Sequence, residues 1–214
     1  MDTDYQRWLW EKTAERCVKN LNKNEFDAHY LPDLQTAAAA ISDMVAAFES
    51  FGFGGSDTTR QLGLLEELEA CGKTVYDHWQ ADLGKAEDLS IRLAQGRCDC
   101  FLCSANAISA TGEIVNVDGI GNRTNAMTFG TRKVVIVAGM NKVTPDLDSA
   151  LKRVREVTAP MRAKSLNMKT PCAESGRCTD CNSPQRICRI TTILHRKPLL
   201  TDISVLLVGQ SLGF

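Results

Sequence analysis

The chain has 214 residues, of which 43% are hydrophobic, and its 25 Lys and Arg residues nearly balance 26 Asp and Glu residues. This length allows a sizeable core in one domain, and the balanced charge argues against nucleic acid or an anionic membrane as a partner. No apolar run approaches the roughly 20 residues of a membrane span, and the start of the chain lacks a signal-peptide pattern, so we expect a cytoplasmic protein.

The first segment predicts an N-terminal arm, residues 1–32. Apolar side chains at near-helical spacing over residues 4–21 predict a helix that packs on the core or on a second subunit. A short alternating strand follows at residues 26–31, before Pro32. An alanine-rich helix is then predicted from Asp33 to about Ser50.

From residue 51 onward, predicted strands and helices alternate. Strands are expected at 51–56, 74–77, 98–103, 113–117, 133–139, 189–195 and 202–209, and helices at 57–72, 81–95 and 145–159. The β-branched run at 133–139 is typical of a strand covered on both faces. This alternation predicts an α/β fold of three layers, a mostly parallel sheet between helices. We expect one domain, 1–214, with a Cys-rich loop inserted at 168–190.

Two polar stretches are predicted at the carboxyl ends of strands. Gly54, Gly55 and Ser56 form a glycine turn that would hold a phosphate or carboxylate, or would serve only as a tight turn. Asn106, within the stretch from residue 104 to 112, follows the strand at 98–103, where an open α/β sheet places the residues that line a crevice. A polar loop that satisfies its own backbone is the equal alternative.

Further along, two segments offer cations at similar positions. Asp118, Gly121, Asn122 and Arg123 belong to a glycine turn that opens toward a helix. The segment after the strand at 133–139 supplies Asn141 and Lys142. Two cations and a glycine cradle at strand ends predict a pocket for an anionic small molecule, whereas a lone Lys or Arg is usually a solvated surface charge.

The densest chemical motif is the cysteine loop. Cys172, Cys178, Cys181 and Cys188 have the spacing C-x5-C-x2-C-x6-C in a stretch with almost no apolar residues. The inner C-x2-C pair suits a metal, and four thiolates would complete an iron–sulfur cluster or a zinc site. Free thiols or disulfides are the alternatives. An odd total of nine cysteines, in a chain without an export pattern, favours a reducing compartment over a disulfide framework.

The other cysteines and the histidines give weaker signals. Cys98, Cys100 and Cys103 are read as small buried hydrophobic residues, with Cys98 and Cys100 on one face of a strand and Cys103 on the other. The three histidines are scattered and form no catalytic triad with a nucleophile. His78 is the one we retain as a pocket candidate.

Several of these segments together resemble one family. They are Gly54-Gly55-Ser56, Ser104-Ala105-Asn106-Ala107 with Thr111-Gly112, Asn116-Val117-Asp118-Gly119-Ile120-Gly121-Asn122-Arg123, Gly139-Met140-Asn141-Lys142 and the loop from Pro171 to Cys188. Over nearly its whole length the chain resembles the lactate-utilisation (LUD) domain family in its short stand-alone form. The better-known relatives belong to a bacterial iron–sulfur system that oxidises L-lactate to pyruvate.

The resemblance implies a fold and a ligand position. The fold is that of ribose-5-phosphate isomerase, glucosamine-6-phosphate deaminase, CoA transferases and 5-formyltetrahydrofolate cyclo-ligase, whose ligands lie over glycine-rich turns at the carboxyl ends of strands. The binding loops of the family correspond to Gly54, Gly55, Ser56, Asn106, Thr111 and Gly112. CoA transferases carry a nucleophilic glutamate in a Glu-x-Gly turn, but this chain has Ala110-Thr111-Gly112 there. Covalent acyl-CoA chemistry through that position is therefore not expected.

Three functions follow as hypotheses. The first is a redox-associated protein of lactate or other 2-hydroxy-acid metabolism, with a cluster in the cysteine loop or an iron–sulfur partner protein docked there. The second is an enzyme or sensor of a phosphorylated, nucleotide-like or folate-like ligand, with no metal. The third is a non-catalytic assembly subunit, with a homo-oligomer as one version, that uses the helix bearing Trp8 and Trp10 and the cysteine loop as contacts. A shared fold alone does not decide among them.

Overall fold

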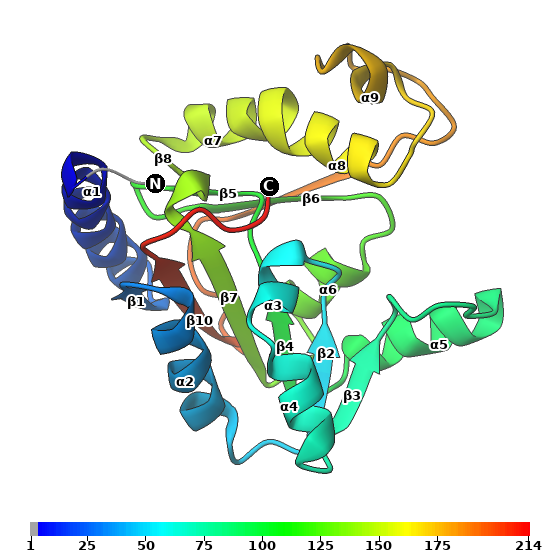
Figure 1. The fold of residues 1–214 in the computed structure, drawn as a ribbon, viewed down its shortest axis with the longest axis horizontal. Helices are drawn as coiled ribbons and strands as arrows, with labels where there is room; N and C mark the ends of the chain where they lie inside the picture. Colours follow the sequence, from blue (N-terminus) through cyan, green and yellow to red (C-terminus); the bar gives the residue numbers. More distant parts are fainter. Residues whose placement is uncertain (1–3) are drawn as a thin grey trace.

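A parallel sheet of six strands organises the chain, and the computed structural model describes residues 4–214. In spatial order its strands are β1 (Asp27–Leu31), β10 (Asp202–Val208), β7 (Lys133–Gly139), β4 (Cys100–Cys103), β2 (Ser50–Phe53) and β3 (Thr74–Asp77). All neighbouring pairs are parallel, as the alternation of strands and helices predicts. The α/β class and the helix-covered parallel sheet are thus confirmed (Figure 1).

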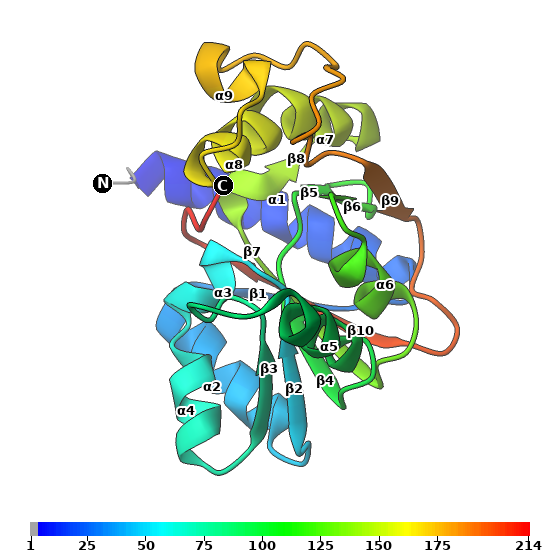
Figure 2. The same ribbon diagram turned by 90° about the vertical axis from the view of Figure 1, so that its right-hand side faces the viewer.

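Helices cover both faces of this sheet. On one face lie α2 (Leu34–Val45), α3 (Asp57–Gln61) and α4 (Leu64–Ala70), and on the other lie α1 (Asp4–Lys23) and α6 (Asn122–Thr128), beside α5 (Lys85–Gln95). Figure 2 shows the helices on the two sides of the sheet. Alternate residues of β7 divide between the two faces: Val135 shares a core cluster with residues of α2 and α4, and Val134 and Ile136 share one with residues of α1 and α6. The fully buried run of β7 is the physical basis of its sequence signal.

A second, smaller sheet was not predicted. It contains β8 (Val143–Thr144), β5 (Ala107–Ser109), β6 (Ile114–Asp118) and β9 (Ile190–Leu194), and β6 pairs antiparallel with both β5 and β9. Helix α7 (Leu147–Arg153) packs on it, and the chain continues through a π-helical turn (Val154–Thr158) into α8 (Ala159–Ser165) and α9 (Pro171–Ser175). Together these elements form the upper part of the molecule in Figure 1.

Several predicted boundaries were wrong for identifiable reasons. The helix expected over 57–72 breaks at Gly63, whose left-handed backbone separates α3 from α4, and Ser56 rather than Asp57 caps α3. The helix expected to begin at Pro145 starts after Asp146, whose side chain accepts a hydrogen bond from the Ser149 amide. It also runs on to Ser165 instead of ending at Ala159.

The cysteines near β4 differ in part from the prediction. Because β4 begins at Cys100, Cys98 lies outside the strand and the alternation rule does not apply to it. Cys98 packs with Cys103 in one core cluster, while Cys100 belongs to the cluster on the opposite face. All three are buried, and burial raises the pKa of each thiol, so these cysteines are packing residues rather than reactive thiols.

The N-terminal arm is a helix followed by a strand, as predicted. Trp10 packs against the core, whereas Trp8 and Leu9 are exposed. Within residues 4–214, no helix is both long enough and apolar enough to span a bilayer.

Candidate functional site

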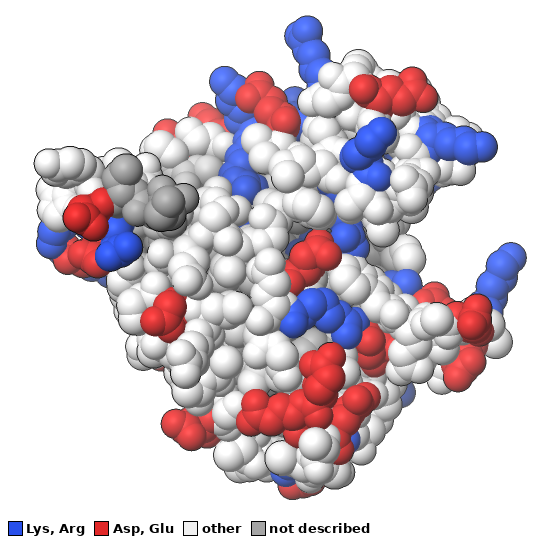
Figure 3. All heavy atoms as spheres, in the orientation of Figure 1, with Lys and Arg blue, Asp and Glu red and all other residues white. Residues whose placement is uncertain are grey.

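A cavity of about 400 Å³ opens where β2, β3 and β4 end and the small sheet begins. Its walls come from the turns after β2, β3, β4 and β6, from Lys142 after β7, from α8 and from the segment Gly213–Phe214. Figure 3 shows the surface hollowed between the α8–α9 part of the molecule and the large sheet, with Lys and Arg side chains near the hollow. The cavity lies at the edge where a parallel α/β sheet generally binds ligands.

The structure brings most of the predicted ligand residues together here. Those that line the cavity are Gly55, Ser56, Asn106, Asp118, Asn122, Arg123 and Lys142. His78, retained as a pocket candidate, also lines it. Burial, and then the nearby Arg92, lower the pKa of His78, and its Nδ1 lies 2.8 Å from Nε2 of Gln95.

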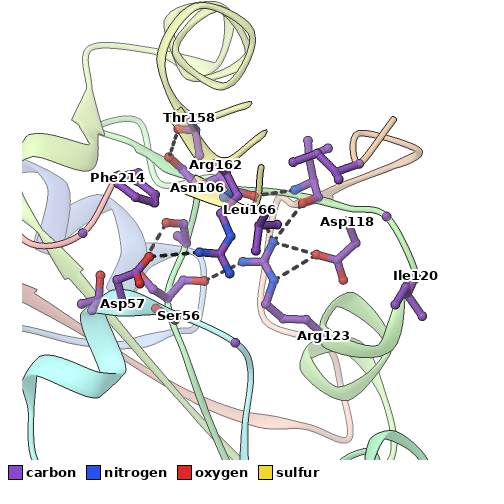
Figure 4. A pocket seen from close by; sticks show the side chains of 18 of the residues that line it. Ser56, Asp57, Asn106, Asp118, Ile120, Arg123, Thr158, Arg162, Leu166 and Phe214 are labelled. Carbon is purple, nitrogen blue, oxygen red and sulfur yellow. Dashed lines mark hydrogen bonds and ion pairs between the residues drawn. The ribbon is translucent and has the colours of Figure 1, made fainter. Parts of the chain in front are cut away.

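Arg123 forms the centre of one wall. Its Nε and Nη2 donate to Oδ1 of Asp118 at 2.9 and 2.7 Å. The remaining acceptors are oxygens of the surrounding loops: Asn116 Oδ1, Ser104 O, Asn106 Oδ1 and Val117 O. Figure 4 shows Arg123 and Asp118 facing each other. Because its N–H groups are all engaged, Arg123 holds these loops in place and its charge is offset by Asp118.

Two of the predicted glycines allow the close packing around Arg123 and its partner Asp118. A Cβ at Gly54 would lie 3.2 Å from Cγ of Arg123 and closer still to the ring of Phe101. Gly121 has a left-handed backbone and begins α6, whose Thr124 amide donates to Oδ2 of Asp118. Asp118 therefore caps α6 and binds Arg123 at the same time.

Lys142 occupies the base of the cavity and is almost completely buried. Its Nζ donates to Thr58 Oγ1 and to Ser104 Oγ, both at 2.9 Å. Among residues 4–214, no carboxylate oxygen lies within 4.0 Å of this nitrogen. Burial, reinforced by the positive charges of Arg153 and Arg123, lowers the pKa of Lys142 to about 7.

Arg153 is a second, half-buried cation, and within residues 4–214 its hydrogen-bond partners are neutral oxygens. It donates to the carbonyl oxygens of Asn141 and Asn106, at 3.0 and 2.7 Å, and to Thr158 Oγ1 at 2.6 Å. Burial lowers its pKa as well. The negative charge of Asp57 acts on Lys142 from beyond 4.0 Å, so the positive charge of Lys142 and Arg153 is only partly offset.

The opposite wall is built on Trp79. The guanidinium groups of Arg162 and Arg60 lie 4.8 and 5.2 Å from the centre of its ring. Arg162 reaches from α8 toward Asp57, and the two make an ion pair of 3.3 Å (Figure 4). Of the described residues, four basic side chains and two acidic ones line the cavity. Trp79 and Arg162 were not predicted as site residues. Arg162 lies beyond residue 159, where its helix was predicted to end.

Besides Gly54 and Gly121, three further predicted residues lie outside the cavity lining. Asn141 accepts from the Leu212 amide and donates to Gly213 O, and so fixes the segment that contributes Phe214 to the cavity. Thr111 and Gly112 lie in the turn between β5 and β6, where the side-chain amides of Asn20, in α1, and Asn24, just after α1, donate to the carbonyl oxygens of Ala110 and Gly112. The chain leaves the large sheet after Cys103 and crosses to β5, and this crossing carries the turn away from the cavity.

The cysteine loop is ordered around Arg186. This side chain donates to the carbonyl oxygens of Cys181 and Cys188, each at 2.8 Å, and pairs with Asp180. Cys172 lies separately on α9. Within residues 4–214, no group of three or more His, Cys, Asp or Glu side chains is placed to ligate one metal ion. The arrangement in this structure therefore does not fit zinc or an iron–sulfur cluster without rearrangement of the loop.

Replacing Gly55 by alanine is expected to displace Trp79. The new Cβ would lie 2.7 Å from Cε2 of the indole, well inside van der Waals contact. We expect a loss of about 1–3 kcal/mol in the free energy of unfolding, as for other overpacked sites, and a shift in tryptophan fluorescence. Gly84→Ala is the matched control, because nothing lies within 4 Å of a Cβ there. Equal stability and emission in the two variants would argue against close packing at Gly55.

Comparison with known proteins agrees with this architecture. The family model described as LUD domain matches residues 14–208. The crystal structure of a DUF162 family protein from Deinococcus radiodurans is similar, with a TM-score of 0.55 and 13% identity over 94% of this chain and 98% of that one. At that identity the likeness shows the fold alone. None of the curated proteins compared matches the chain. The chain belongs to the LUD domain family.

Proposed function

We propose that the chain binds a small anionic metabolite in the cavity above Lys142. The observation that carries this proposal is the buried Lys142 ammonium, which donates to two neutral hydroxyl groups and has no carboxylate oxygen within 4.0 Å among the described residues. Burying an unpaired charge is costly, and proteins usually pair such a charge with an opposite one. A ligand carboxylate or phosphate would supply the missing negative charge.

The other charges of the cavity support the same conclusion. One carboxylate oxygen of Asp118 accepts from Arg123 and the other accepts from the Thr124 amide of α6. The charge of Asp118 therefore balances Arg123 rather than Lys142. The ion pair of Arg162 with Asp57 is long, at 3.3 Å, and partly exposed, so a bound anion can compete for Arg162 at little cost. An acidic ligand would thus meet cations on two sides of the cavity.

The size of the cavity bears on the ligand. Its volume of about 400 Å³ falls within the range of about 300–1,000 Å³ that is common for metabolite and cofactor sites. A three-carbon acid such as lactate would leave much of that volume to water. The dimensions therefore favour a larger anion, of the phosphorylated, nucleotide-like or folate-like kind.

A role in 2-hydroxy-acid oxidation, with an iron–sulfur cluster or an iron–sulfur partner protein, is the second candidate. It is supported by membership of the LUD family and by a second cavity of about 590 Å³ that Cys178 and Cys188 line together. Iron and zinc analysis of protein purified without oxygen tests it. About four iron atoms per chain would support a cluster, and protein with neither metal would remove the resident cofactor from this candidate.

Anion binding is expected to weaken as the pH rises above 7. Lys142 attracts an anion only when protonated, and its pKa in the free protein is about 7. Apparent affinity should then fall by up to about tenfold per pH unit. Calorimetric titration with lactate, sugar phosphates, nucleotides, CoA and folates at pH 6 and pH 8.5 measures this. Lys133→Met is the control, since Lys133 is buried but paired with Asp202. If no anion binds, or if affinity is independent of pH, the proposal fails.

A further inference from the structure

The amine of Lys142 differs from that of the other buried lysine of the chain. Lys133 is also buried, but its Nζ forms an ion pair of 2.7 Å with Asp202, which keeps it charged. Among the residues that the structure describes, the hydrogen-bond partners of the Lys142 amine are the hydroxyl oxygens of Thr58 and Ser104. A neutral amine is tolerated in such a setting, and a neutral lysine has a lone pair that can act as a nucleophile.

Lys142 lies in the cavity lining, where a bound ligand can reach the lone pair of its amine. The residue lines the same cavity as Thr58, Ser104 and Arg162. The two hydroxyl groups lie 2.9 Å from Nζ, so they also lie beside any carbon atom that bonds to it. Hydroxyl groups both donate and accept hydrogen bonds, so they can stabilise an alcohol oxygen that forms at that carbon and relay its protons.

We propose that Lys142 is a nucleophile that condenses with the carbonyl group of an anionic aldehyde or ketone to form an imine. This inference rests on the proposed binding of an anion in the cavity and names the substrate class. The acidic group of the substrate would lie toward Arg162, and its carbonyl carbon toward Nζ. Because the iminium carries one positive charge, it replaces the ammonium without changing the charge of the site.

The condensation balances without an oxidant or a reductant. The lone pair of Nζ forms a C–N bond to the carbonyl carbon, and the π electrons of the carbonyl move to its oxygen, which takes up a proton. The resulting alcohol is protonated again and leaves as water when its C–O bond breaks. Counted from the ammonium, nitrogen loses one proton before it attacks and a second after the C–N bond forms, and these two protons leave in the water. The nitrogen lone pair forms the C=N bond of the iminium as the C–O bond breaks. Attack needs the neutral amine, which the pKa of about 7 makes available at neutral pH.

Reductive trapping tests the proposal. The full chain is incubated separately with pyruvate, 2-oxoglutarate and glyceraldehyde 3-phosphate, reduced with cyanoborohydride, and analysed by intact mass and peptide mapping. We expect a single adduct on Lys142 with at least one of them and, at saturating substrate, a trapping rate that rises with pH as Nζ loses its proton, at or above pH 7 because a bound anion raises the pKa of Lys142. Lys142→Met should give no such adduct, and Lys133→Met should be trapped like the unaltered chain.

The outcomes separate this inference from the proposed function. If calorimetry shows that one of these carbonyl compounds binds, yet no adduct forms on Lys142, imine formation is overturned while anion binding stands. Adducts spread over surface lysines, and equal in Lys142→Met, would overturn it as well. If none of the three binds or is trapped while other anions bind with the expected pH dependence, the carbonyl substrate class is wrong. Circular dichroism of both variants verifies that they are folded.

Discussion

Replacement of Arg123 by alanine is expected to lower the free energy of unfolding by roughly 3–5 kcal/mol, the usual cost of removing one partner of a buried ion pair. The side chains of Arg123 and Asp118 are only 14% and 7% exposed. Without the guanidinium, Asp118 keeps a buried negative charge, and the amide oxygens of Asn106 and Asn116 lose a donor. Urea unfolding followed by circular dichroism measures the change.

Two further variants serve as controls for this result. Arg132→Ala removes an ion pair of 3.4 Å to Asp99 from a side chain that is 75% exposed, and it should cost less than about 1 kcal/mol. Arg123→Lys keeps the charge but not the planar set of donors, so it should recover only part of the loss. If Arg123→Ala were as mild as Arg132→Ala, Arg123 would not be the side chain that holds the cavity loops together.

Replacement of Lys142 by methionine is expected to have the opposite effect on stability. Methionine fills a similar volume without the cost of burying a charge, so the free energy of unfolding should rise by about 1–4 kcal/mol at pH 6. Thr58 and Ser104 keep the carbonyl oxygens of Leu212 and Ala105 as partners. The same variant should lose anion binding, and stability and function would then conflict at this residue.

The pH dependence distinguishes a buried charge from ordinary packing. Burial lowers the pKa of Lys142 from 10.5 to about 7 in the folded chain. Below pH 7 the lysine is protonated in both states, but between pH 7 and 10.5 the unfolded chain holds a proton that the folded chain has released. Stability of the unaltered chain therefore rises with pH across that window, and the advantage of the methionine variant shrinks. A constant difference between pH 6 and pH 10 would contradict a buried, unpaired ammonium.

The sequence predicted most of the large sheet because its strands carry local signals. The bounds of β3 and β7 match the predicted strands, and α2 begins directly after Asp33, where the helix was predicted to start, although it ends at Val45 rather than near Ser50. The small sheet was missed because β5 and β8 are only three and two residues long. Strands that short depend on pairing with distant segments rather than on their own pattern. The continuation of α7 through the π-helical turn into α8 likewise reflects packing that the sequence does not reveal locally.

The candidate site could be predicted in part for the same reason. Glycine turns and polar residues at strand ends pointed to Ser56, Asn106, Asp118 and Arg123, because parallel strands end at a common edge. Local pattern could not show that every N–H group of Arg123 would be engaged by its neighbours, while the described part of the chain would place no carboxylate oxygen within 4.0 Å of Nζ of Lys142. That difference depends on which loops meet in space.

The positions of other residues depended on long-range topology. Thr111 and Gly112 were placed near the cavity by family resemblance, but the crossing to β5 carries them toward α1. Arg162 lies on a helix whose predicted end, at residue 159, was too early in the chain, and no local motif indicated this residue. The spacing of the four cysteines predicted a metal site, yet Arg186 orders the loop through backbone carbonyl groups.

Direct titration of Lys142 tests the central claim most closely. Heteronuclear NMR of the lysine ε-methylene groups, with Lys142→Met to assign the signal, gives the pKa without and with a bound anion. We expect a value of about 7 in the free protein and an upward shift when a carboxylate or phosphate ligand binds. A Lys142 signal that titrates near 10.5, and that no anion displaces, would contradict the account.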